Sequence, residues 1–114
     1  MNRVEMVVGT AGEVAVVRVS GDVDSETAGS VEQTLRGQLG TAGGLIVDLL
    51  GVGFLASAGL NTLVVIHQEA VASGTPFAVV AVQHAVLRPI EVLGLDGTLT
   101  VRGSVEEARA EITG

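Results

Sequence analysis

The fold is decided by residues 44–66, which read GLIVDLLGVGFLASAGLNTLVVI. The apolar run 45–50 is long enough for one buried strand and too short for a helix. A loop punctuated by Gly51 and Gly53 follows, and a helical pattern begins at Ser57. Serine is a favourable N-cap, because its hydroxyl oxygen can accept a backbone N–H from the first helical turn. This stretch therefore predicts a strand, a glycine-rich loop and a helix capped by Ser57.

Further strands and helices are predicted on both sides of this stretch. Apolar segments bounded by turn residues predict strands at 4–8, 13–19, 77–82 and 98–101. Helical spacing predicts helices at 28–39, 57–73, 84–93 and 104–112, the last capped by Ser104. Proline is best tolerated in a first turn, so the regular part of the third helix is expected to begin near Pro89. In the helix after Ser57, the residues spaced to face the core are Leu60, Leu63, Val64, His67 and Val71.

The predicted order of elements is β-β-α-β-α-β-α-β-α. This alternation is typical of an α/β fold with a mixed central β-sheet and helices packed on it. The opening hairpin makes the sheet mixed, and the crossovers between parallel strands are expected to be right-handed. At 114 residues, with no repeat or linker, the chain is expected to form a single domain over residues 1–114.

Composition excludes several classes of function. The chain is 47% hydrophobic but only 2% aromatic, so its core must be aliphatic, and it has no cysteine for a disulfide or a thiolate metal site. The net charge is −7 and there is no lysine, which disfavours nucleic-acid binding. No apolar run approaches the roughly 20 residues that span a bilayer, and the N-terminus is a poor signal peptide. We expect a cytoplasmic protein that binds neither nucleic acid nor membrane.

Motifs of catalysis and cofactor binding are missing from the sequence. His67 and His84 have no second ligand at metal-binding spacing. The glycines at 51, 53 and 59 match neither type of phosphate-binding loop. No carboxylate pair or Ser–His–Asp set is recognisable. We therefore expect a binding protein without a cofactor, and not an enzyme.

Three separate segments resemble the STAS domain family of bacterial anti-sigma factor antagonists, and together they span most of the chain. Residues 21–28, GDVDSETA, resemble the family pattern Gly-acidic-x-Asp-x-x-Thr-Ala at the start of the first helix. Residues 47–60, VDLLGVGFLASAGL, resemble its strand, loop and helix, usually written Asp-Leu-x-x-Val-x-Phe-x-Asp-Ser-Ser/Thr-Gly-Leu. Residues 86–95 resemble the helix and turn near the end of the family pattern. The order and spacing of the three motifs make the resemblance specific.

The resemblance implies a site around Ser57. In the family, the first hydroxyl residue of the second motif is the phosphoacceptor, and Ser57 occupies that position here. The chain departs from the pattern at two positions, where Ala56 replaces an aspartate and Ala58 replaces the second hydroxyl residue. The residues that the resemblance assigns to partner binding are Asp22, Asp24, Thr27, Ala56, Ala58, Gly59 and Leu60.

The function that the resemblance implies is partner switching. The chain would bind an anti-sigma factor with a GHKL-type kinase fold and so release a sigma factor. Phosphorylation of Ser57 would break that complex, because the phosphate adds about −1.5 to −2 charges, and a phosphatase would restore it. The ATP would belong to the kinase. The chain itself would be a monomer or a weak homodimer.

Other interpretations of the same residues stay open at this stage. Ser57 can be an N-cap alone, worth about 1 kcal/mol. Asp22 and Asp24 can serve only the start of the following helix, to which Glu26 also contributes. Because Ala56 and Ala58 depart from the family pattern, the chain can instead be a STAS scaffold or sensor module that binds a nucleotide or another small ligand, or that assembles into a larger signalling complex. A phosphorylation-independent antagonist lies between these two interpretations.

Overall fold

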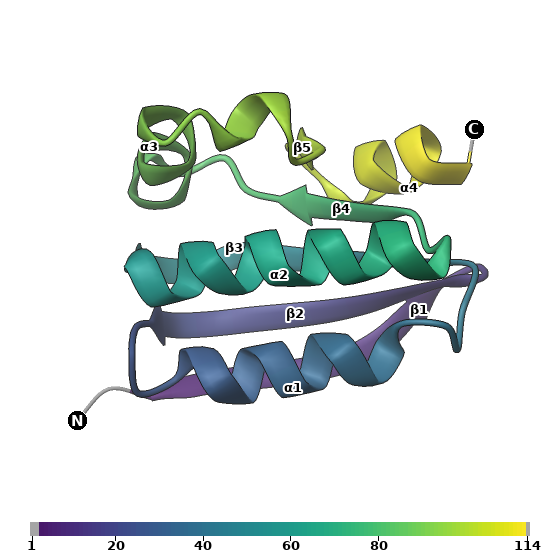
Figure 1. Cartoon of the computed structure of the whole chain (residues 1–114), viewed down its shortest axis with the longest axis horizontal. Helices are drawn as coiled ribbons and strands as arrows, with labels where there is room; N and C mark the ends of the chain where they lie inside the picture. The colour runs from purple at the N-terminus through teal and green to yellow at the C-terminus, as the bar shows by residue number, and fades with distance from the viewer. Residues whose placement is uncertain (1–2, 114) are drawn as a thin grey trace.

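A computed structural model describes residues 3–113 and contains a five-stranded sheet in the order β1-β2-β3-β4-β5 (Figure 1). β1 is antiparallel to β2, and the remaining pairs are parallel. The elements in chain order are β1 (Val4–Ala11), β2 (Val14–Val23), α1 (Ala28–Gln38), β3 (Gly44–Leu55), α2 (Ser57–Ser73), β4 (Phe77–Val80), α3 (His84–Val92), the 3₁₀ helix η1 (Leu95–Gly97), β5 (Val101–Arg102) and α4 (Val105–Thr113). The α/β fold class, the mixed sheet and the predicted order of strands and helices are confirmed.

Two layers of helices cover the sheet, and alternate residues of each strand supply the two cores. Val17, Val47 and Val79 belong to the larger core, which is completed by residues of α1, α2 and α3. Val16 and Ile46 belong to the smaller core under α4. Figure 1 shows α1 and α2 lying side by side along one face of the sheet. Because valine and isoleucine pack well on a pleated surface, this aliphatic composition suits the sheet without help from aromatic residues.

The face of the sheet under α4 is only partly covered. α4 packs against β3, β4 and β5. Toward β1, the same face carries a shallow hollow of about 240 Å³, lined by Val7, Arg18, Val19, Ser20, Asp48, Leu50 and Gly51. Among the side chains around it, Val7 is exposed and Leu50 nearly half so.

The strand predicted at 45–50 continues to Leu55, so the predicted glycine loop is wrong. Two register shifts occur in the pairing with β2, one between Arg18 and Ser20 and one between Gly21 and Asp22. At each shift, β3 contains one more residue than β2, as in a β-bulge. The side chain of Asp48 stabilises the first shift, because its Oδ1 accepts the backbone N–H of Leu50 at 2.9 Å. The bulges let a twelve-residue strand pair with the ten residues of β2.

Other predicted boundaries also need correction. α3 begins at His84 and runs through Pro89, although its regular part was expected to start near the proline. The carbonyl that this proline leaves without a helical donor belongs to Ala85, which is an exposed residue. The last strand comprises only Val101–Arg102, because the N–H groups of Thr98 and Leu99 bond to the carbonyl of Leu95 and continue the turn.

The helix α2 faces the core with a different set of residues from that predicted. Leu60 and Leu63 are buried as expected, whereas Val71 is 68% exposed. The prediction for Val71 is wrong because the four consecutive apolar residues 63–66 point to all sides of the helix. The sequence therefore does not mark which face of the helix is buried. The residues of α2 that complete the buried face are Thr62, Ile66 and Ala70.

The cap predicted for the C-terminal helix is confirmed. The Oγ of Ser104 accepts the backbone N–H of Glu107 at 3.1 Å. The Glu107 carboxylate reaches back to the N–H of Gly103 at 3.4 Å. This reciprocal arrangement is close to a capping box, and it fixes the start of α4.

Candidate functional site

The first two predicted motifs meet at one end of the sheet, where β2 and β3 have their C-terminal ends. Asp22 lies opposite Phe54 in the register of these strands. The backbone N–H of Ala56 donates to the carbonyl of Val23 at 2.8 Å. The loop after β2 and the start of α2 are therefore neighbours, as expected, and Ser57 follows directly.

Ser57 is the first residue of α2, and its predicted role as N-cap is wrong. Ala56 occupies the cap position with extended backbone (φ −84°, ψ 174°), and no side chain caps the helix. Ser57 is exposed, and its hydroxyl makes no hydrogen bond to any residue within 3–113. A helix N-terminus presents free N–H groups and a positive dipole potential, which favour a negative group. The hydroxyl is thus available to solvent at a place that can hold a phosphate.

Asp24 and Thr27 build the turn that leads into α1. The Oδ1 of Asp24 accepts the N–H of Glu26 at 2.9 Å and the N–H of Thr27 at 3.2 Å. The Thr27 hydroxyl donates to the carbonyl of Asp22 at 2.8 Å and accepts the N–H of Asp24 at 2.9 Å. Both side chains are buried. They fix the shape of this loop, so that of the two predicted aspartates only Asp22, which is half-buried, can be reached by a partner.

Gly59 and Leu60 hold α2 against the sheet. A Cβ added to Gly59 would lie 2.6 Å from Cδ1 of Leu55 and 2.8 Å from Cγ1 of Val23, so only glycine fits without a shift. Leu60 is buried in the larger core, and Ala56 and Ala58 are half-buried. Of the sequence-predicted site residues, the structure brings Ser57, Asp22, Ala56 and Ala58 to the surface, while Asp24, Thr27, Gly59 and Leu60 are internal.

Two residues of this region were not among the predicted site residues. Phe54 is 52% exposed, which agrees with the expectation of a partly exposed apolar surface around residues 54–60. Gln83, the N-cap residue of α3, donates from Nε2 to the carbonyls of Leu49 at 2.6 Å and Val52 at 2.8 Å. Its contacts are more than thirty residues away along the chain, so no local pattern could indicate them.

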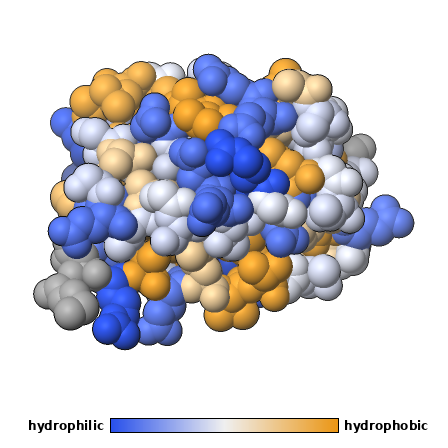
Figure 2. Space-filling model, turned by 60° about the horizontal axis from the view of Figure 1, so that its bottom comes forward, coloured by the Kyte–Doolittle hydropathy of each residue, from blue (hydrophilic) through white to orange (hydrophobic). Residues whose placement is uncertain are grey.

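An ion-pair network crosses from α1 to α2. Arg36 binds Glu69 through Nε and Nη2 at 2.7 and 2.6 Å, and it also contacts Glu32 at 3.0 Å. The hydrogen bonds from Arg36 lower the pKa of Glu69, and those carboxylates raise the pKa of Arg36. Figure 2 shows a face on which hydrophilic groups gather at the centre with apolar patches around them.

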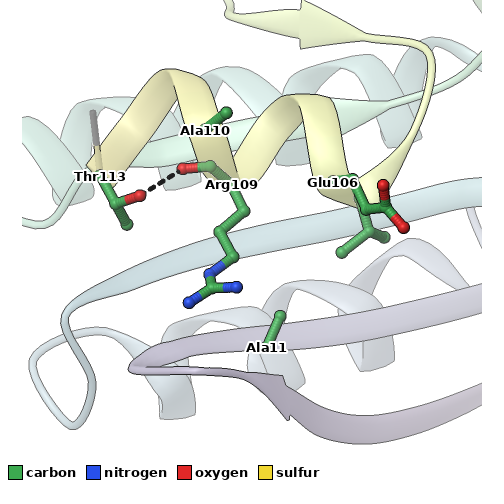
Figure 3. A pocket seen from close by; sticks show the side chains of 6 residues that line it. Ala11, Glu106, Arg109, Ala110 and Thr113 are labelled. Carbon is green, nitrogen blue, oxygen red and sulfur yellow. Dashed lines mark hydrogen bonds between the residues drawn. The ribbon is translucent and has the colours of Figure 1, made fainter.

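Another hollow lies at the other end of the sheet from Ser57. It has a volume of about 500 Å³ and is bounded by α4 and by Ala11 of the β1–β2 hairpin. In Figure 3, Arg109 extends from α4 toward that hairpin, while the Thr113 hydroxyl donates to the Arg109 carbonyl at 2.7 Å. Within residues 3–113, no group of three or more His, Cys, Asp or Glu side chains could hold a metal ion. Among the helices described, none is long and apolar enough to cross a membrane.

The fold is that of an α/β domain that presents an exposed serine, Ser57, between the end of β3 and the start of α2. The model of the STAS domain family matches residues 5–108, and the chain belongs to this family. It is 31% identical over 102 residues to the anti-sigma-F factor antagonist RsfB of Mycobacterium tuberculosis, covering 89% of this chain and 83% of that protein.

Solved structures share the whole fold. The crystal structure of an anti-sigma factor antagonist from Mycobacterium paratuberculosis matches with a TM-score of 0.91 at 32% identity, covering 98% of this chain and 96% of that one. The unphosphorylated form of the anti-sigma factor antagonist SpoIIAA from Bacillus matches with a TM-score of 0.78 at 16% identity, covering 96% and 97%. At that identity, the likeness to SpoIIAA concerns the fold alone.

Proposed function

We propose that this chain is an anti-sigma factor antagonist whose binding is switched off by phosphorylation of Ser57. The observation that carries the proposal is the exposed Ser57 hydroxyl, which is not used as a helix cap and which follows directly after the paired ends of β2 and β3, where Asp22 lies opposite Phe54. The names of the relatives that are 31% and 32% identical support the antagonist role. The chain acts by binding and not as an enzyme, and it needs no cofactor.

The contact surface for the anti-sigma factor centres on Phe54, Ser57 and Asp22. An exposed aromatic ring is an effective anchor in a protein interface, because it buries a large apolar area at little cost in conformational entropy. Ala56 and Ala58 have small side chains that project little from this surface, so a partner can approach the backbone of the first helical turn. Asp24, Thr27, Gly59 and Leu60 position these groups and do not themselves contact the partner.

Phosphorylation breaks the complex through charge and desolvation. A phosphoserine at position 57 brings about −1.5 to −2 charges into an interface that includes the apolar Phe54 ring. The Asp22 carboxylate, at the paired ends of β2 and β3, adds negative charge to the same end of the sheet, and the free N–H groups of α2 hold the phosphate in place on the chain itself. The partner thus faces a solvated anion where it previously met a small hydroxyl.

The partner is an anti-sigma factor with a GHKL-type kinase fold, which supplies the ATP. A phosphatase removes the phosphate and restores binding, and the released sigma factor is the output. The absence of the family aspartate at Ala56 removes a carboxylate that could orient the serine, so phosphorylation here proceeds without that group. We place the protein in the cytoplasm, where its partners act.

The test is a pull-down from lysate of the native host with the whole chain as bait, followed by mass spectrometry. The baits are wild type, Ser57→Ala, Ser57→Asp and Thr41→Asp. The last adds the same charge at an exposed position before the start of β3, at the opposite end of the sheet. We expect an anti-sigma factor on all baits except Ser57→Asp. Phosphorylation of wild type, but not of Ser57→Ala, by that partner and ATP would complete the support.

Two outcomes would contradict parts of the proposal. Equal capture by Ser57→Asp and wild type would retain the antagonist role but remove Ser57 as its switch, leaving a phosphorylation-independent antagonist. Capture of no anti-sigma factor on any bait would contradict the antagonist role. A thermal-shift measurement with GTP would then test the scaffold or sensor interpretation, for which a large stabilisation is expected.

A further inference from the structure

β1 is an edge strand without the features that usually prevent edge strands from pairing. It contains no proline or lysine, and Glu5 is its only charged residue. All eight residues pair with β2 in an unbroken register, with no bulge. Edge strands of soluble proteins are commonly protected by prolines, lysines or bulges, because their outer backbone groups can pair with another strand. The outer edge of β1 is therefore suited to accept a strand.

Two valines are exposed at the centre of β1. Val7 is 64% exposed and lies opposite Arg18, on the face of the sheet that α4 leaves open. Val8 is 49% exposed and lies opposite Val17, on the face of α1 and α2. A strand added along β1 would cover both side chains, since cross-strand neighbours on each face come into contact.

We propose that this edge pairs with β1 of a second copy of the chain, antiparallel and centred on Val7. A two-fold axis perpendicular to the sheet must place one residue of β1 opposite the same residue of the other copy. A centre at Glu5 would oppose two carboxylates, which is unfavourable. A centre at Val7 instead places Val7 opposite Val7, Met6 opposite Val8, and Glu5 opposite Gly9 of the second copy.

Charge complementarity favours this register. The Nη1 atom of Arg18 lies 3.9 Å from the point where a Cβ on Gly9 would be. Arg18 is half-exposed, and its ion pair with Asp48, from Nε to Oδ2 at 3.6 Å, leaves the Nη groups directed elsewhere. Glu5 and Gly9 lie on the same face of β1, because they are separated by an even number of residues. In the dimer, Glu5 of each copy therefore lies over Gly9 of the other, beside the guanidinium of Arg18.

The inference does not rest on the proposed function. It uses the outer edge of β1 and Arg18, whereas the proposed antagonist surface uses Asp22, Phe54 and Ser57 at the ends of β2 and β3. Failure of one proposal leaves the other intact, since cross-linking and sedimentation of the chain require no anti-sigma factor.

The register can be tested by cysteine cross-linking, because the natural chain has no cysteine. Opposed residues of antiparallel strands have Cα atoms about 4.5–5.5 Å apart, within the range that a disulfide requires. Under mild oxidation, Val7→Cys should form dimers at least about tenfold faster than Val71→Cys, a similarly exposed valine on α2. Glu5→Cys alone should cross-link slowly, and an equimolar mixture with Gly9→Cys should yield the mixed dimer.

Sedimentation of the natural chain tests the dimer without a cross-link. We expect the weight-average mass to rise toward that of a dimer over a roughly hundredfold increase in concentration. Val7→Lys should weaken association about tenfold or more, whereas Val71→Lys should leave it unchanged. A monomer at every concentration, together with equal cross-linking of Val7→Cys and Val71→Cys, would overturn the proposal. A dimer that Val7→Lys leaves intact would also overturn it, because the interface would then lie elsewhere.

Discussion

The bulged end of β3 depends on one side chain from the connection between β4 and α3, and replacing Gln83 by alanine should destabilise the fold. The Nε2 group donates to the carbonyls of Leu49 and Val52, at 2.6 and 2.8 Å, beyond the last paired residues of β3 and β4. Its Oε1 also accepts the N–H of Val82 at 3.1 Å. The substitution removes these bonds and leaves both carbonyls of β3 without this donor.

The expected loss follows from the number and burial of these bonds. A hydrogen bond contributes about 1 kcal/mol net, and a buried carbonyl left without a donor costs about 1–3 kcal/mol. The β3 carbonyls are only partly buried, so water replaces some of the loss. We therefore expect Gln83→Ala to lower the free energy of unfolding by about 2 kcal/mol, which corresponds to about 8 °C in Tm.

The assay is urea unfolding followed by circular dichroism, because the chain has neither Trp nor Tyr for fluorescence. Gln33→Ala, at an exposed position of α1, is the matched control and should change stability by less than about 0.5 kcal/mol. Gln83→Glu sharpens the test. The carboxylate of this variant cannot donate a hydrogen bond, so at pH 7 the variant should lose more stability than Gln83→Ala. Near pH 3 the variant should recover part of this stability, because the protonated acid donates one bond. A loss below about 0.5 kcal/mol for Gln83→Ala would refute the reasoning.

Three further predictions follow from the contacts of the helices. Gly59→Ala places a methyl against the Leu55 side chain and should cost about 1–3 kcal/mol in urea unfolding; unchanged stability would mean that α2 shifts freely. Arg36 lowers the pKa of Glu69, so this pair stabilises the fold above the unfolded-state pKa of the carboxyl and ceases to do so as pH falls through the lower folded value. The stability difference between wild type and Glu69→Gln should accordingly shrink toward acidic pH and in high salt, and a pH-independent difference would contradict this. Ser104→Ala should cost about 1 kcal/mol in thermal unfolding, whereas Ser104→Asp, another good N-cap, should not.

Local patterns in the sequence indicated the elements and their order. The apolar run 45–50, the helical spacing after Ser57 and the capping serine at 104 each depend on residues close together in the chain. Local propensity and hydrophobic period act over such distances, so the α/β class and the mixed sheet could be predicted. The three family motifs gave the STAS assignment for the same reason, and the family match over residues 5–108 confirms it.

The errors have a common cause in long-range contacts. Gly51 and Gly53 predict a loop when read alone, yet β2 pairs with this segment and the bulges absorb its extra residues. Val71 lies on an apolar helix whose sequence does not mark one face, and only packing against the sheet decides which residues are buried. Ser57 could cap α2 by its residue type, but the bond from Ala56 to Val23 moves the cap position to Ala56.

The sequence by itself determined the order of strands and helices, the aliphatic core, the family and the position of the serine that the resemblance marks. The tertiary structure alone decided which site residues are accessible. It turns Asp24 and Thr27 inward, exposes Phe54 and frees the Ser57 hydroxyl from a capping role. The physical reason is that exposure and hydrogen bonding depend on which backbone groups a neighbouring strand already satisfies, and that neighbour is distant in sequence.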